Sequence, residues 1–263
     1  MSTAAHPTPP LLTLVIERST CRPGWALFRD ADCLLETISD EEPSRAPGWL
    51  ARLGDALAKN HVSLAEVDRF AAGLGPGSFS GTRAAVAALQ GMALPGGKPL
   101  TGVSSAAALA FDLLTARAAR GLQTPMAVVG DARRERLWCA VYALEGPRLV
   151  VGSRKKSCGN LPPVCADRET FATTPPAHDA ADFTLTPWAD LPQHLPPGAV
   201  VISPDWDRIG TRLSDVLPAA QLVAGVCMPT AAGVGRLLLA DPASARAEPA
   251  PIYLHPAVAE VRI

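Results

Sequence analysis

The sequence predicts an α/β protein whose first 120 residues form a mixed five-stranded sheet covered by helices. Three observations support this prediction. Short apolar runs bounded by turn residues alternate with segments of helical periodicity, and their order in the first half is β-β-β-α-β-α-β-α. Of the 263 residues, 48% are apolar, which is enough for a sizeable core. Because parallel strands need crossover helices, this order specifies an antiparallel meander followed by parallel strands.

The elements of the first half follow from local patterns. Three apolar runs joined by tight turns are expected to be strands, at 11–17, 24–29 and 32–38. A helix is expected over 48–60, because Leu50, Leu53 and Leu57 recur at the spacing of one helix face. Strand and helix then alternate over 67–73, 79–94, 99–104 and 106–120.

A second α/β section is expected to begin near residue 121. It opens with two strands and ends with a β-α-β-α alternation, over 125–131, 136–144, 199–203, 205–217, 220–226 and 230–240. The stretch 158–198 is rich in proline and lacks periodicity, so we expect loops there, and we expect a tail from Pro242 onward. The chain is therefore divided into an N-terminal lobe, 1–120, and a second, smaller lobe, 121–263.

Composition limits the classes of function. The formal net charge is −1 and the pI is near 6.5, so contact with nucleic acid must be local or supplied by a partner. The apolar stretch 11–16 is too short for a signal sequence or a membrane span, which predicts a cytoplasmic protein. The six cysteines contain no C-x-x-C pair, so we expect buried reduced thiols rather than a zinc site.

The segment GLGPGSFSGTR, Gly73 to Arg83, lies between a predicted strand and a predicted helix. It lacks the lysine of a phosphate-binding P-loop and the third glycine of a dinucleotide loop. The centre of GSFSG is Phe79, so a serine nucleophile elbow is also excluded. Two interpretations remain, a capped turn without a ligand and a helix start that attracts an anion. The residues concerned are Gly75, Gly77, Ser78, Ser80 and Arg83.

The helix after this loop carries a stripe of very small residues. The stripe is Gly81, Ala84, Ala88 and Gly91, bordered by Ala85 and Met92. Small side chains let another backbone come close. The stripe packs either within its own layer or against another molecule, and both alternatives stay open on different faces.

Four segments together resemble the bacterial TsaB (YeaZ) family, within the TsaD-like superfamily. In the family's order they are GLGPGSFSGTRAAVAALQGMAL, GVSSAAALA, DARRERLWCAVY and PIYLHP, and the first is specific. The resemblance implies a two-lobed fold of the actin-like ATPase type, the ASKHA or ribonuclease H-like class. It also implies a role in making threonylcarbamoyladenosine (t6A) in tRNA.

In that family TsaB is a non-catalytic partner of the transferase TsaD; TsaE joins the pair, and TsaC supplies threonylcarbamoyl-adenylate transiently. The resemblance therefore implies that ATP or ADP and the metal belong to partner subunits, and that tRNA is reached through the complex. We predict a partner interface, used by TsaD or by a second copy of the chain when TsaD is absent. It consists of Leu50, Leu53, Leu57, Gly81, Ala84, Ala85, Ala88, Gly91 and Met92.

We expect no catalytic residue, no metal site and no cofactor bound by the isolated chain. The five histidines never reach the H-x-x-x-H spacing with which TsaD-like enzymes hold a metal. The alternatives are a small-molecule kinase-like or residual peptidase-like enzyme of the same fold, and a scaffold unconnected with tRNA. The chain departs from the family at Glu17-Arg18-Ser19, where relatives have D-T-S, and at Pro43, where they have histidine.

Overall fold

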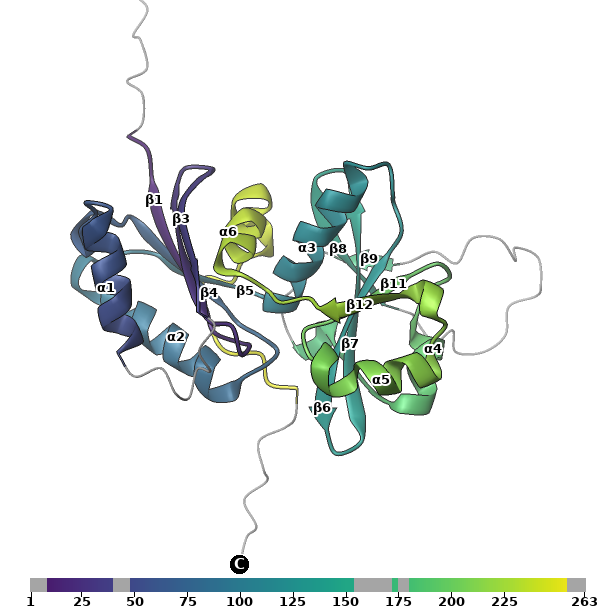
Figure 1. Cartoon of the computed structure of the whole chain (residues 1–263). Helices are drawn as coiled ribbons and strands as arrows, with labels where there is room; N and C mark the ends of the chain where they lie inside the picture. Colours follow the sequence, from purple (N-terminus) through teal and green to yellow (C-terminus); the bar gives the residue numbers. More distant parts are fainter. Residues whose placement is uncertain (1–8, 40–47, 154–171, 175–179, 255–263) are drawn as a thin grey trace, which may run out of the picture.

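The computed structural model describes residues 9–39, 48–153, 172–174 and 180–254 (Figure 1). Two sheets lie on either side of a central pair of helices, α3 (Ser105–Ala118) and α6 (Ala231–Ala240). Helix α6 packs on the first sheet, α3 packs on the second, and the two helices pack on each other. Most of the buried apolar side chains belong to one core that runs through both sheets and this helical layer.

The first sheet has five strands in the order β3-β2-β1-β4-β5. Its strands are β1 (Leu12–Glu17), β2 (Gly24–Arg29), β3 (Asp32–Ile38), β4 (Arg69–Gly73) and β5 (Leu100–Val103). Strands β1, β2 and β3 pair antiparallel, whereas β4 is parallel to both β1 and β5. The predicted mixed sheet and its order of elements are confirmed.

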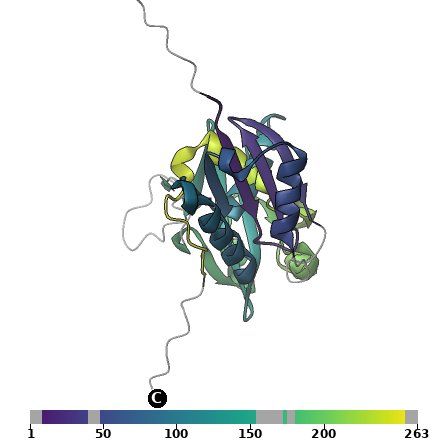
Figure 2. The same cartoon turned by 90° about the vertical axis from the view of Figure 1, so that its left-hand side faces the viewer.

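Two helices cover the outer face of the first sheet (Figure 2). They are α1 (Trp49–Lys59) and α2 (Phe79–Ala93), and two short 3₁₀ turns, Leu64–Glu66 and Leu94–Gly96, follow them. Leu53, Leu57 and Leu89 are at most 2% exposed, because apolar residues three and four positions apart form the stripe that faces the sheet.

The second sheet is built mainly from the second half of the chain. Six strands follow the order β12-β11-β6-β7-β8-β9, and β10 pairs with β7. The bounds are β6 (Met126–Arg133), β7 (Arg136–Glu145), β8 (Arg148–Ser153), β9 (Ala172–Thr174), β10 (Thr184–Pro187), β11 (Val200–Ser203) and β12 (Leu222–Val226). Helices α4 (Leu191–His194) and α5 (Trp206–Val216) cover its outer face, over a second apolar cluster.

The prediction of a loop-rich stretch at 158–198 is wrong for its described part. Residues 180–198 contain β10 and α4, and Phe183 lies edge-on to the Trp138 ring, with the centroids 5.6 Å apart. Periodicity does not reveal these elements, because each is only four residues long and contains a proline. Residues 158–171 and 175–179 lie outside the described chain.

The prediction of a tail from Pro242 is also wrong as far as Leu254. The backbone of Arg246 exchanges two hydrogen bonds with Gly102, at 2.8 and 2.9 Å, and the N–H of Ile252 donates to the carbonyl of Leu74 at 2.9 Å. This segment therefore returns to the first sheet. The division into lobes at residue 120 stays a prediction, but α6, from the predicted second lobe, packs on the first sheet.

The expectation of buried thiols holds only in part. Cys139 is buried and Cys227 is partly buried, whereas Cys21 and Cys33 are exposed; all four thiols are free. Cys158 and Cys165 lie outside the described residues. Within the described ranges, no helix is both long enough and apolar enough to cross a membrane.

Candidate functional site

The loop Gly73 to Arg83 meets the ends of two other strands at one edge of the first sheet. Strands β1, β4 and β5 run parallel, so their carboxyl ends gather there, as ligand sites of open α/β sheets commonly do. The hydroxyl of Ser105, after β5, donates to Glu17 Oε2 at 2.6 Å and accepts from the N–H of Gly75 at 2.9 Å. One hydroxyl therefore links all three strand ends.

Glu17 is sealed inside this junction. Its side chain is fully buried, and burial raises the pKa of the carboxyl, although hydrogen bonds from Ser105 and Ser19 oppose the shift. The N–H of Ser19 donates to Glu17 Oε1 at 2.5 Å. A Cβ at position 73 would lie 1.8 Å from Glu17 Oε2, so Gly73 is required by close approach. Glu17 thus stands where relatives have aspartate. Its longer side chain is buried at the turn after β1, where other parts of the chain surround it.

The glycines of the loop are packed against Arg18 and Ser19, the residues after β1. Gly75 has φ 86°, and a Cβ at Gly77 or Gly81 would lie 2.1 Å from a backbone oxygen of Ser19 or Arg18. The hydroxyl of Ser78 accepts from the N–H of Gly81 at 3.2 Å, which confirms the predicted cap. The predicted anion-binding role of the loop stays a prediction.

Three residues around the start of α2 form an exposed cluster that the sequence analysis missed. The rings of Phe79 and Tyr253 lie 5.3 Å apart, and they are 58% and 44% exposed. The guanidinium of Arg83 lies over Phe79, 5.0 Å from its centroid. Ser80, a predicted loop residue, is exposed beside them. The available signal was Phe79 itself, a large apolar residue between two serines at a helix start.

The predicted interface residues divide into buried and accessible sets. Four are buried in this chain: Leu53, Leu57, Gly81 and Ala85. Five are partly or fully exposed: Leu50, Ala84, Ala88, Gly91 and Met92. The prediction is wrong for the buried four as contact residues, because the apolar face chosen from the sequence is the face that packs on the chain's own sheet.

The surface actually offered by α1 and α2 is offset by one position from the predicted stripe. On α2 the exposed residues are Phe79, Ser80, Arg83, Ala87, Gln90 and Gly91. On α1 the small residues Ala51, Gly54 and Ala58 are exposed at i, i+3 and i+7, a spacing that the sequence also contained. Apart from the backbone of the helix itself, no atom of the described residues lies within 4 Å of a Cβ added at Gly54 or Gly91. We call this surface, with Leu50, Leu94 and Tyr253, the outer helical face.

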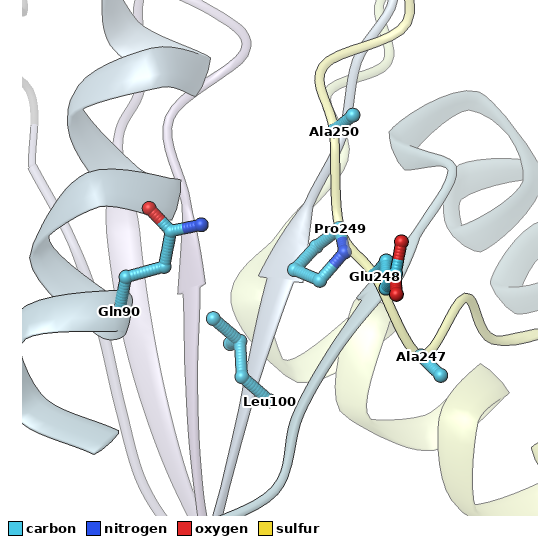
Figure 3. Close-up of a pocket in the computed structure, with 6 residues that line it drawn as sticks. All are labelled: Gln90, Leu100, Ala247, Glu248, Pro249 and Ala250. Carbon is cyan, nitrogen blue, oxygen red and sulfur yellow. The ribbon is translucent and has the colours of Figure 1, made fainter. Parts of the chain in front are cut away.

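An open depression borders the outer helical face (Figure 3). Its volume is about 570 Å³, and its lining is Gln90, Leu100, Ala247, Glu248, Pro249 and Ala250. Gln90 projects from α2 toward Pro249 of the returning C-terminal segment. Glu248 is the one ionisable side chain in the lining, so the depression extends a surface rather than assembling a catalytic group.

The described residues contain no group of three or more His, Cys, Asp or Glu that could hold a metal ion. His61 is exposed and His194 is partly exposed, as expected for surface histidines. His6, His178 and His255 lie outside the described part of the chain.

Two kinds of sequence comparison found proteins that are similar to this chain. A family model described as TsaD, tRNA N6-adenosine threonylcarbamoyltransferase, matches residues 50–161. The tRNA threonylcarbamoyladenosine biosynthesis protein TsaB of Buchnera aphidicola is 51% identical over 45 residues, which are 17% of this chain and 20% of that protein. An uncharacterized protein of Mycobacterium leprae is 29% identical over 206 residues, which are 74% of this chain and 51% of that protein. The chain thus spans about a fifth and about half of these relatives.

Two solved structures share the fold over nearly the full length. YeaZ from Pseudomonas aeruginosa has a TM-score of 0.64 at 20% identity and covers 92% of this chain and 100% of its own. A protein described as similar to peptidase YeaZ, also from Pseudomonas aeruginosa, has a TM-score of 0.66 at 22% identity, with coverage of 93% and 100%. The predicted actin-like fold is confirmed. The chain is similar to the TsaB (YeaZ) family in its fold and, over shorter stretches, in its sequence.

Proposed function

We propose that this chain is the non-catalytic partner of a TsaD-like transferase in the formation of t6A in tRNA, and that it binds TsaD through the outer helical face. The observation that carries the proposal is the pair of helix glycines, Gly54 and Gly91, that have open space where a side chain would be. The similarity to TsaB and to the TsaD family model indicates the reaction in which the pairing serves.

No packing contact among the described residues requires glycine at these two positions. Glycine in a helix costs about 1 kcal/mol relative to alanine. Gly54 lies in the middle of α1 and Gly91 in the last turn of α2, and neither has a neighbour that excludes a Cβ. The close approach of helices from a second protein would use that space, as small residues do at tightly packed helix crossings.

Exposed apolar side chains surround the small residues. Leu50, Phe79, Leu94 and Tyr253 are 47%, 58%, 81% and 44% exposed. Aromatic residues and arginine are enriched among the side chains that dominate binding energy, and here Arg83 lies over Phe79. A stable interface buries at least about 1,000 Å² in total, an area that two adjacent helices and the C-terminal segment can supply.

The proposal assigns ATP or ADP, the metal and the chemistry to the partner subunits TsaD and TsaE, with TsaC as transient supplier of the adenylate. It is supported by Glu17 and Ser105, whose polar atoms are used in hydrogen bonds within the chain at the strand ends. A second copy of the chain would occupy the same face when TsaD is absent. Contact with tRNA then occurs within the complex.

The first test is association. Ala87→Arg places a long charged side chain in the outer helical face, on the exposed side of α2, and we expect it to weaken binding to TsaD more than tenfold. Ala116→Arg is the matched control, because Ala116 is an exposed alanine on α3, in the layer between the sheets. Gel filtration and titration calorimetry measure binding, and circular dichroism confirms folding. Unchanged binding of the Ala87 variant would remove this face from the proposal.

The second test is reconstitution of the reaction from TsaC, TsaD, TsaE, tRNA, threonine, bicarbonate and ATP, with t6A measured by mass spectrometry. We expect modification to depend on this chain and to be lost with Ala87→Arg. Full modification without the chain would favour a scaffold unconnected with tRNA. Calorimetry of the chain alone with ATP and magnesium should show no tight binding; tight binding would favour the kinase-like enzyme.

A further inference from the structure

The hairpin between β6 and β7 projects from the lower end of the second sheet, below α5 (Figure 1). Its turn carries the segment DARRER, Asp131 to Arg136, which lies outside the outer helical face. Arg133 pairs with Arg136 across the ladder, after a register shift that follows Asp131. Arg134 and Glu135 therefore form the tip of a two-residue turn.

The backbone of this turn adopts a conformation that its residues disfavour. Arg133, Arg134 and Glu135 have φ values of 64°, 50° and 59°, in the left-handed region. Turns of this geometry normally contain asparagine and glycine, which tolerate positive φ. Non-glycine residues in this region cluster at functional sites, where the surrounding structure holds them in place.

Two arginines of α5 hold the turn. Arg208 lies 3.2 Å from Asp131, and Arg212 lies 2.7 Å from Glu135. The Arg212 guanidinium also lies over the Trp188 ring, 4.2 Å from the centroid. Asp131 and Glu135, the acidic residues of the turn, are thus each paired with an arginine of α5. The two ion pairs hold the turn against this helix.

The basic groups of the hairpin are left facing solvent. Arg134 and Arg136 are exposed, and neither side chain forms an ion pair or hydrogen bond with any described residue. Arg133 contacts Asp131 at 3.3 Å, but its side chain is 72% exposed. Asp205 and Asp207 are the further acids on this end of α5, and Asp205 is engaged by Arg208. Two uncommitted guanidinium groups therefore extend from a rigid support.

We propose that the β6–β7 hairpin binds the sugar–phosphate backbone of RNA through Arg134 and Arg136, with Arg133 at its edge. The planar guanidinium matches the oxygens of a phosphate, and a position fixed before binding reduces the entropy lost on contact. The net charge of −1 means that the attraction is local to the hairpin rather than a property of the whole surface.

The choice of RNA rests on the proposed function, in which tRNA is the substrate of the complex, and it makes this chain contact tRNA directly. An acidic protein surface is the other occupant that two arginines could bind. RNA binding must weaken as salt rises, with a slope of log Kd against log salt that reflects the number of phosphates contacted. That slope gives a readout that stability changes do not imitate.

The experiment uses a fluorescein-labelled, unmodified tRNA transcript that reads a codon beginning with A. Its binding is measured by anisotropy at several salt concentrations, for the chain alone and for its pair with TsaD. The test variant is Arg134→Gln/Arg136→Gln, and the charge-matched control is Arg29→Gln/Arg120→Gln, which alters exposed arginines on β2 and after α3. We expect the test variant to bind about tenfold more weakly, with a slope reduced by about 2, and the control to be unchanged.

A further variant guards against misfolding. Arg134→Gly should fold at least as well as the natural chain, because glycine accepts the φ of 50°, and should still weaken binding. Equal binding by all variants, or equal weakening by the control pair, would overturn the proposal. Competition by poly-glutamate but not by unlabelled tRNA would overturn it in favour of an acidic protein. Pairing with TsaD, measured separately by gel filtration, should be unchanged in every hairpin variant. If the natural chain did not pair with TsaD, the proposed function would be wrong, but the RNA measurement on the chain alone would still test the hairpin.

Discussion

Small residues serve opposite purposes on the inner and the outer side of α2. On the inner side, at the start of the helix, a Cβ at Gly81 would lie 2.1 Å from the carbonyl oxygen of Arg18, so glycine is needed for the loop to dock on β1. On the outer side, at the last turn, a Cβ at Gly91 would meet no described residue outside its own helix within 4 Å. A stripe of small residues along one helix is therefore two structural features, one that serves the fold and one that leaves a surface open.

The largest contrast is expected between two leucines of this region. Leu89 is fully buried and Leu94, in the turn after α2, is 81% exposed. Leu89→Ala should lower the free energy of unfolding by about 2–5 kcal/mol, because it removes packing and leaves a cavity. Leu94→Ala should change it by less than about 0.5 kcal/mol. Urea denaturation of both variants measures the difference, and comparable losses would show that α2 has no distinct outer side.

The two glycines should respond to alanine with opposite signs. Gly81→Ala should destabilise the chain by about 1–3 kcal/mol, since the methyl group overlaps a backbone oxygen that cannot move alone. Gly91→Ala should stabilise the isolated chain by about 0.5–1 kcal/mol, through helix propensity, and should weaken pairing with TsaD. Denaturant unfolding and calorimetric binding are the two measurements. A Gly91 variant that is more stable and pairs normally would contradict the use of this space by a partner.

Glu17 extends the comparison to the interior, where the loop before α2 docks on the end of β1. Burial raises the pKa of its carboxyl above 4.5, the ordinary value of a glutamate that is exposed to water. The folded chain therefore binds a proton that the unfolded chain has released, and this contribution to stability is lost as pH rises from about 4.5 through the raised pKa. The slope from this group is at most about 1.4 kcal/mol per pH unit.

Glu17→Gln should remove that pH dependence, so that the variant gains stability relative to the natural chain as pH rises through this window. Denaturation curves collected at intervals from pH 4 to pH 8 measure the effect. Glu145→Gln is the control, because Glu145 is exposed at the end of β7. Parallel stability profiles for the Glu17 variant and the natural chain would mean that the carboxyl is ionised in its buried position.

Much of the fold could be predicted from local patterns. The three strands of the meander, α1, α2 and the strands between them have the expected order and nearly the expected ends, because alternating and helical apolar spacing is a local property. Strands β6 and β7 were also expected, although their pairing as a hairpin and the left-handed conformation of Arg133 were not. Strands β8, β9 and β10 were missed, since short segments are recognised by their partners across the sheet rather than by their own pattern.

The candidate site was predicted less completely than the fold. The loop residues Gly75, Gly77 and Ser78 lie where the sequence placed them, at the start of α2. The ring contact between Phe79 and Tyr253 joins residues 174 positions apart, and no periodicity connects them. Which side of an amphipathic helix meets solvent also depends on the angle at which the helix crosses its sheet, so the exposed stripe differed by one position from the expected one.

The sequence by itself determined the order of strands and helices, the glycine loop with its serine cap and the resemblance to the TsaB (YeaZ) family, because each of these is written in neighbouring residues. Only the tertiary structure decided which glycines face open space, that the segment after α6 returns to β5, and that two arginines of α5 fix the turn of a distant hairpin. The reason is that burial and ion pairing depend on distances between segments far apart in the chain, and those distances exist only after the two sheets have packed on α3 and α6.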